Sequence, residues 1–282
     1  MAILISLKNY HLLVFMVWFF LALFAPASAS SAANIPSGMV VVGGGEYSPL
    51  FKDPTLPSGV MVESYYIDKL LVSNDDFTAF TTANPEWSKQ NVKSLFADTQ
   101  YLHHFPNITV SEVAERSPTW LSQPVTNVSW FAARAYCKAL DKRLPALDEW
   151  EYAARASRTE VDASHNAEHL SRILSWYSAL TSSALPGVSE TPTNVWGIQG
   201  MHGVVWEMVN DFNSVLITGE SRGDTQLERE LFCGAGAASS SNPSDYAAFM
   251  RYALRSSYEA SYTLGSLGFR CAKNIVELQS IE

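Results

Sequence analysis

The chain has 282 residues, of which 47% are hydrophobic, 12% aromatic and 17% charged, with 19 basic against 28 acidic side chains. This is enough material to bury a substantial core, and the aromatic share argues against a disordered chain. The formal charge of −9 argues against a nucleic-acid partner, which needs a basic face, and three cysteines are too few for a disulfide scaffold.

Residues 1–29 are predicted to form a cleaved signal peptide. An apolar run from Leu12 to Phe24 follows the charged Lys8, and small residues then lead to an expected cut after Ala29. A helix of that run is only about 20 Å long, short of the ~30 Å hydrocarbon core, although an uncleaved anchor stays the alternative. The mature chain then carries a charge of −10 and lies in the periplasm or outside the cell, with no stable membrane span, where disulfides form.

The mature chain is expected to hold one domain, because no repeat, charge block or long linker divides it. Residues 30–38 form a short N-terminal segment before this domain, which spans residues 39–275, and residues 276–282 form a tail. Two strands are predicted at its start, Met39–Val42 and Val60–Ile67. No GxGxxG, Walker, HExxH or CxxC motif is present, which removes several common enzyme classes.

Three helices are predicted from capping residues and apolar spacing. Ser73 begins the first, in a capping pair with the acid three residues on, and Ser129 caps the second. The third spans residues 147–155, while residues 84–123 and 157–190 show no clear period and short strands and turns follow them. Such short elements indicate a loop-rich α+β domain rather than a doubly wound sheet. The second helix is expected to bury one face comprising Trp130, Ala133, Cys137 and Leu140.

Four segments in order carry a recognisable pattern. They are Met39-Val-Val-Val-Gly-Gly-Gly-Glu-Tyr47; Tyr65-Tyr-Ile-Asp-Lys-Leu-Leu-Val-Ser-Asn74 with Phe77; Pro124-Val-Thr-Asn-Val-Ser-Trp130, running on to Glu149-Trp-Glu-Tyr-Ala-Ala-Arg155; and Trp196-Gly-Ile-Gln-Gly-Met-His-Gly-Val-Val-Trp-Glu207 with the closing Leu267-Gly-Phe-Arg-Cys-Ala272. Together they resemble the formylglycine-generating enzyme family, also called the sulfatase-modifying factor domain. The similarity covers nearly all of residues 39–273 and implies a C-type-lectin-like variant fold, a single compact α+β domain with many loops.

The cysteines separate the resemblance from the family's named reaction. The family pattern implies a disulfide between Cys137 and Cys271, with two buried reduced thiols as the alternative. Formylglycine generation uses two further cysteines that hold Cu(I), and residues 234–270 contain none, so copper is not expected. Cys233 stands where the family has Arg-Gly-Gly-Ser, and it is either a nucleophilic or redox-sensitive thiol or a small buried hydrophobe.

Calcium is the cofactor that the resemblance implies, at the turn before the Trp-Glu pair. Glu207, Gly203 and Val205 match the family's ligand positions, and calcium favours such oxygen donors. Gly200 replaces the family's Asn or Asp, so one side-chain ligand is missing. The alternative is that Glu207 caps neighbouring backbone amides.

Several other residues have a structural and a functional interpretation. Three tryptophans, Trp130, Trp150 and Trp206, are expected to hold the domain together. Gly203 is expected at a tight turn where the backbone approaches another group closely. Ion pairs are predicted from Arg143 and Arg155 to three acids, Asp148, Glu149 and Glu151, with a catalytic role as the alternative. Metal binding is considered for His103, His104, His165 and His169, the last two at helical spacing, against exposed surface histidines. Glycosylation sequons stand at Asn107 and Asn127, the second expected to form a local turn instead.

The resemblance implies an exported maturation or accessory factor that acts on a partner protein or peptide. Arg255 would orient a carboxylate or carbonyl of the substrate, and Glu207 or Asp211 would move protons. The alternative is a non-catalytic ligand- or protein-binding module, because no nucleophile–base pair is evident. The groove expected under the first hypothesis is lined by Cys233, Trp206, Ser239 and Arg255.

Overall fold

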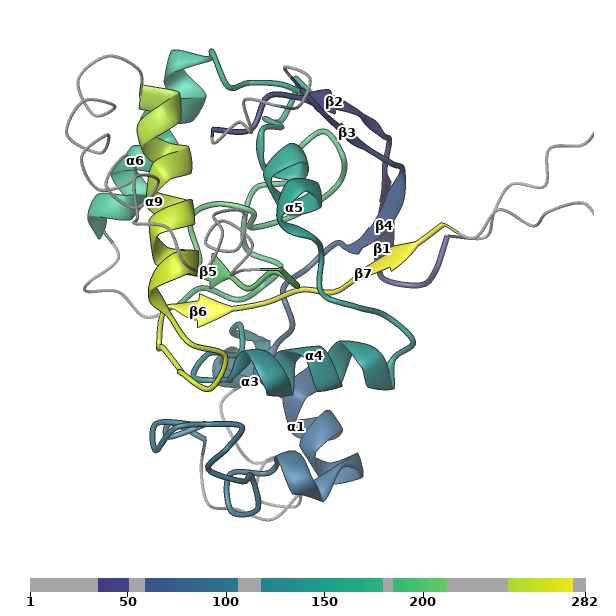
Figure 1. The fold of residues 1–282 in the computed structure, drawn as a ribbon, viewed down its shortest axis with the longest axis vertical. Helices are drawn as coiled ribbons and strands as arrows, with labels where there is room; N and C mark the ends of the chain where they lie inside the picture. Colours follow the sequence, from purple (N-terminus) through teal and green to yellow (C-terminus); the bar gives the residue numbers. More distant parts are fainter. Residues whose placement is uncertain (1–34, 51–58, 106–117, 180–184, 212–242, 276–282) are drawn as a thin grey trace, which may run out of the picture. The chain divides into compact units, whose positions relative to one another are not determined.

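The computed structural model describes residues 35–50, 59–105, 118–179, 185–211 and 243–275. The chain divides into two units, residues 1–34 and residues 35–282, and the second holds every described residue (Figure 1). In that unit short strands alternate with helices, which confirms the predicted α+β class with many loops.

A three-stranded antiparallel sheet holds the two ends of the described domain together. Its strands are β1 (Met39–Val42), β4 (Tyr65–Asp68) and β7 (Ala272–Asn274), in the order β1-β4-β7. Met39 lies opposite Asp68 and Tyr65 opposite Asn274. The apolar sequence of β4 suits its central place in the sheet, because this strand is almost wholly buried between its two neighbours.

Two smaller sheets complete the strand structure. The strands β2 (Gly45–Tyr47) and β3 (Val60–Val62) are antiparallel, and β5 (Trp206–Glu207) runs parallel to β6 (Leu267–Gly268). The predicted single strand Val60–Ile67 is therefore wrong, because it splits into β3 and β4 in different sheets. At the break, the Ser64 hydroxyl accepts a hydrogen bond from the Gly44 amide at 2.8 Å.

The helices begin where their capping residues predict. Ser73 caps the first with a complete capping box, and the Ser129 hydroxyl accepts from the Ala132 amide at 3.2 Å. Leu140 ends the second of the capped helices and is 49% exposed, so its predicted place on the buried face is wrong. The described helices are α1 (Asn74–Ala83), η1 (Pro85–Trp87), α3 (Pro118–Ser122), α4 (Trp130–Ala139), α5 (Leu147–Ala154), α6 (Ala167–Ala179) and α9 (Pro243–Ser257).

Four of these helices lie where no helix is predicted: the short η1 and α3 fall in residues 84–123, and α6 and α9 are the two long ones. Helix α6 falls in the weakly patterned stretch 157–190, and α9 falls in the region expected to hold strands and turns. They pack side by side along one flank of the domain (Figure 1). In α9, Arg251 and Arg255 lie on the buried face and pair with Glu151, so this helix lacks a simple apolar stripe.

The disulfide implied by the family pattern is confirmed. It joins Cys137 of α4 to Cys271, directly before β7, and the two Cα atoms are 5.6 Å apart. Both cysteines are completely buried in the main core. The bond closes a loop of 134 residues, which stabilises the fold by about 5 kcal/mol in the chain-entropy model.

No helix among the described residues is long and apolar enough to cross a membrane.

Candidate functional site

Trp206 lies at the centre of an aromatic cluster that β5 and α6 build together. Its ring stacks on Tyr177 with centroids 4.8 Å apart and lies 5.0 Å from Trp176. The amide of Trp206 donates to the Ser266 carbonyl at 2.8 Å, which fixes the strand that carries it. Trp206 is half-buried, so one part of its ring supports the core and the rest is available at the surface.

Beside this aromatic cluster lies a buried ion cluster formed by Glu151 of α5 with Arg251 and Arg255 of α9. Glu151 accepts from Nε and Nη2 of Arg251 at 2.9 and 2.6 Å and from Nη1 of Arg255 at 2.6 Å. Arg255 also stacks over the Trp150 ring, with its guanidinium carbon 4.4 Å from the centroid. Only 3% of Arg255 is exposed, so its guanidinium lies in the core, and its role in orienting a substrate stays a prediction.

The hollow between the aromatic cluster and the ion cluster is very small. It measures about 10 Å³, near the space that one water molecule needs. Trp206, Glu207 and Arg255 all line it. The described residues therefore leave no room for a substrate group between these two clusters.

Glu207 does not fit the calcium site that the family pattern implies. Its carboxylate is completely buried and accepts from Nε and Nη2 of Arg270 at 2.7 and 2.9 Å. The Trp150 indole donates to the same carboxylate at 2.9 Å. A cation bound there would displace these donors and face the Arg270 guanidinium.

The turn before Trp206 depends on a left-handed backbone at Gly203. Its φ is +96°, and nothing lies within 4 Å of the position that a Cβ would take. The predicted turn is therefore confirmed, but the reason is backbone conformation and not a close approach of another group. Gly200 is left-handed too, with φ +66°.

The predicted ion pairs are partly confirmed. Arg143 holds Glu149 through two hydrogen bonds of 2.6 Å, as expected from their proximity in sequence. Arg155 pairs with Asp162 instead of the predicted acids, and Glu151 turns to α9. The tryptophans differ as well: Trp150 is buried, whereas Trp130 and Trp206 are only half-buried.

Asp211 also has a structural partner. Its Oδ1 accepts from the Leu147 amide at 2.7 Å, at the first turn of α5. Burial raises the pKa of this carboxyl, although the backbone hydrogen bond acts against that rise. Glu207 and Asp211, the two residues predicted to transfer protons, therefore both make hydrogen bonds that stabilise the fold. Cys233, Ser239 and the sequon at Asn107 lie outside the described residues.

His165 and His169, expected at helical spacing, do not share a helix. Helix α6 begins at Ala167, so His165 precedes it and is exposed, while His169 is buried. His103 and His104 stack edge to face with centroids 5.4 Å apart, and burial lowers the pKa of His104 to about 4. The expected local turn at Asn127 is confirmed, because it is buried with φ +52°.

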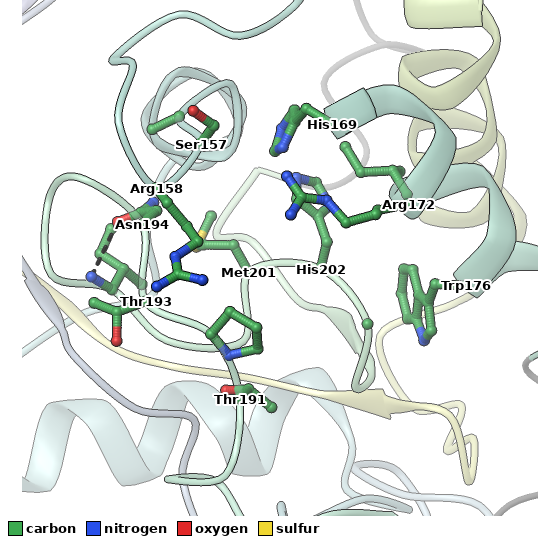
Figure 2. Close-up of a pocket in the computed structure, with 15 residues that line it drawn as sticks. Ser157, Arg158, His169, Arg172, Trp176, Thr191, Thr193, Asn194, Met201 and His202 are labelled. Atoms are coloured by element: carbon green, nitrogen blue, oxygen red, sulfur yellow. Dashed lines mark hydrogen bonds between the residues drawn. The ribbon is translucent and has the colours of Figure 1, made fainter. Parts of the chain in front are cut away.

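A second cavity of about 260 Å³ lies beside the aromatic cluster, between α6 and the loop of residues 191–203 (Figure 2). His169 and His202 both line it, and their ring centroids are 6.0 Å apart. Burial lowers the pKa of His202 to about 3, and burial together with Arg172 lowers that of His169. Both imidazoles are therefore neutral at pH 7.

Sequence reasoning missed this pocket and the ion cluster for the same reason. Arg251 and Glu151 lie 100 residues apart, and His169 and His202 belong to different segments with no shared motif. The only local signal is the His-Gly pair at 202–203 inside the family motif.

A family model for the sulfatase-modifying factor enzyme 1-like domain matches residues 25–275. The formylglycine-generating enzyme of Mus musculus is 24% identical over an alignment of 286 positions, gaps included, which covers 88% of this chain and 76% of the mouse protein. The inactive C-alpha-formylglycine-generating enzyme 2 of Bos taurus is 36% identical over 97 residues, 31% of this chain and 32% of that protein. The solved structure of PvdO from Pseudomonas aeruginosa superposes with a TM-score of 0.46 and 17% identity, over 84% of this chain and 94% of that one.

Proposed function

Because the chain belongs to the sulfatase-modifying factor enzyme 1-like family, we propose that it is an exported maturation or accessory factor for a secreted or periplasmic protein or peptide. In this role the protein acts without the copper–dicysteine chemistry of formylglycine generation. Export rests on the apolar run and small residues of the first 29 positions, which predict a cleaved signal peptide.

The observation that carries this proposal is the absence of any cysteine between positions 234 and 270. Cu(I) needs soft sulfur ligands, and a lone thiol at Cys233 is a poor substitute for a thiolate pair. The rest of the family framework is retained, including the disulfide and the Trp-Glu turn. Retained scaffold with lost copper ligands is what a branch with a changed or accessory role requires. The Bos taurus relative that is named inactive supports the idea that this domain can be kept in a protein that does not catalyse the reaction.

A second candidate function is a non-catalytic binding module on a lectin-like fold. It is favoured by the commitment of Arg255, Glu207 and Asp211 to buried contacts, which leaves none of these three for chemistry on a substrate. Under this alternative the half-buried Trp206 and its neighbours on α6 act as a recognition surface only.

The first test separates this protein from a copper-dependent oxidase. The mature protein is loaded with Cu(I) and incubated with oxygen and a peptide carrying a sulfatase cysteine motif, and peptide mass and oxygen uptake are measured. We expect no conversion and no stoichiometric copper. Conversion at a rate that depends on copper would refute the proposal.

A second experiment separates the two candidate functions. Covalent cross-linking in the exported fraction identifies the partner, and its intact mass is compared between cells with and without this protein. A mass change that requires the protein, and that is altered by Cys233→Ser, supports maturation with a role for that thiol. A captured partner of unchanged mass supports the binding module.

The predicted location is tested separately. N-terminal sequencing of the protein from the exported fraction should give a chain that begins at Ser30. Retention of the first residues in a membrane fraction would support the uncleaved anchor instead.

A further inference from the structure

The cavity between α6 and residues 191–203 has a positive lining. Arg158 and Arg172 both line it, and none of its fifteen lining residues is Asp or Glu. Arg172 extends from α6 into the cavity (Figure 2), and its nearest acid, Glu168, is 3.9 Å away and 85% exposed. An exposed pair of that geometry leaves the guanidinium available to a bound anion. Arg158 is exposed and pairs with no acid among the described residues.

Most other polar groups of the lining already have partners inside the protein. The Ser157 hydroxyl accepts from the Glu160 amide at 3.1 Å, and the Asn194 side chain accepts from the Ile198 amide at 3.0 Å. The Thr193 hydroxyl accepts from Gln199 at 3.1 Å. These groups shape the cavity, so recognition of a ligand falls to the groups that remain.

Three buried polar atoms of the lining have no partner among the described residues: Nε2 of His169, Nδ1 of His202 and Oγ1 of Thr191. His169 is itself only 8% exposed. Leaving a buried polar atom without a partner is costly, so these three atoms mark the cavity as a candidate site for a polar ligand.

The protonation state of His202 defines what the ligand must offer. Its Nε2 lies 2.9 Å from the Ala154 carbonyl, which only accepts, so Nε2 carries the proton. Since the ring is neutral, Nδ1 is a bare acceptor, and the ligand must donate a hydrogen bond to it.

The remaining wall is apolar and is formed by Ile173, Trp176, Ile198 and Met201. A volume of about 260 Å³ is below the range of drug-sized ligand sites, so the group that fits is about the size of one amino-acid residue.

We propose that this cavity binds the C-terminal residue of a peptide: the carboxylate between Arg158 and Arg172, the backbone N–H at Nδ1 of His202, and an apolar side chain against Ile173 and Met201. A guanidinium recognises a carboxylate in a planar, two-point geometry, which suits a chain end. The inference rests on the proposed function in taking the ligand from a peptide partner, and it gives that partner a free, apolar C-terminus.

The test is calorimetric titration of the whole mature protein with small probes. N-acetyl-leucine carries all three recognised groups, whereas N-acetyl-leucinamide lacks the charge and 4-methylpentanoate lacks the N–H donor. We expect each of these two analogues to bind at least about tenfold more weakly than N-acetyl-leucine. Equal binding of the amide would overturn the carboxylate assignment, and equal binding of 4-methylpentanoate would overturn the donor assignment. Equal binding of inorganic phosphate would show a general anion site and also overturn the proposal.

Matched variants place the binding in this cavity. Arg172→Gln and Arg158→Gln should each weaken N-acetyl-leucine binding about tenfold, and both side chains are exposed enough for the fold to tolerate the change. Lys138→Gln on α4, also exposed and outside the cavity lining, is the control and should bind as the wild type does. Unchanged affinity in both arginine variants would overturn the proposal.

The two proposals fail in different ways. If N-acetyl-leucine binds as expected but cross-linking in the exported fraction finds no partner, the proposed function fails and the pocket stands as a site for free N-acyl amino acids. If a partner is captured, and neither Arg172→Gln nor removal of the partner's last residue reduces capture, the pocket inference fails and the proposed function stands.

Discussion

Replacing Glu151 by glutamine tests whether the buried ion cluster is the structural centre of the α5–α9 interface. The substitution keeps the size of the side chain, removes its charge and replaces one of its two acceptor oxygens by an NH2 donor. Glu151 is buried and accepts from Arg251 and Arg255, which are also buried. In the variant two guanidiniums stay in the interior with no carboxylate to balance them.

The expected loss is large. Removing one partner of a buried ion pair costs about 3–5 kcal/mol, because the partner left behind is an uncompensated charge. Here a single carboxylate serves two arginines, so we expect the upper part of that range. For a domain of this size, 1 kcal/mol lowers Tm by about 2–4 °C, so Tm should fall by roughly 10 °C or more.

The pH dependence has a definite sign. Burial of Glu151 acts to raise its pKa, but the guanidiniums of Arg251 and Arg255 outweigh burial and hold the pKa below its usual value. The stability that this charge contributes is therefore fully present above the unfolded pKa of about 4.3 and is lost as pH falls through the lowered folded value. The gap between wild type and Glu151→Gln should stay constant from neutral pH to about pH 5 and narrow below about pH 4.

Urea unfolding followed by circular dichroism at several pH values measures this gap. Glu168→Gln is the matched control, since its carboxylate is 85% exposed and 3.9 Å from Arg172, and it should cost less than about 0.5 kcal/mol. A Glu151→Gln loss below about 1 kcal/mol, or a gap that widens in acid, would refute the assignment of this cluster.

Three further predictions concern the framework. Replacing Cys137 and Cys271 together by alanine should lower the free energy of unfolding by about 5 kcal/mol and abolish the mobility shift between reduced and non-reduced gels. Gly203→Ala should cost about 1–2 kcal/mol in urea unfolding, because φ is +96°, whereas Gly43→Ala, whose Cβ would meet Trp196 at an ordinary 3.6 Å, should cost less than about 1 kcal/mol. Calcium addition or chelation should leave Tm unchanged, because Arg270 already neutralises Glu207; a rise in Tm that saturates with calcium would contradict this.

Local chemistry made several features predictable. Ser73 and Ser129 mark helix starts because a hydroxyl satisfies amides only two or three residues away. Arg143 and Glu149 are six residues apart, so their ion pair could be predicted from their spacing in the sequence. The disulfide followed from a different source, the family pattern, since nothing in the chain's composition pairs two cysteines 134 residues apart.

The sequence by itself determined the α+β class, the family and the loss of the copper cysteines, because these depend on which residues are present and on short-range spacing. Tertiary structure alone decided which charges meet. Glu207 pairs with Arg270, which lies 63 residues away in the sequence. Glu151 pairs with arginines of α9, a helix that the sequence periodicity does not predict. Any carboxylate can pair with any guanidinium, so the choice belongs to the fold that buries them. The same holds for His169 and His202, whose neutral rings become a binding pocket only once α6 packs beside the loop that carries His202.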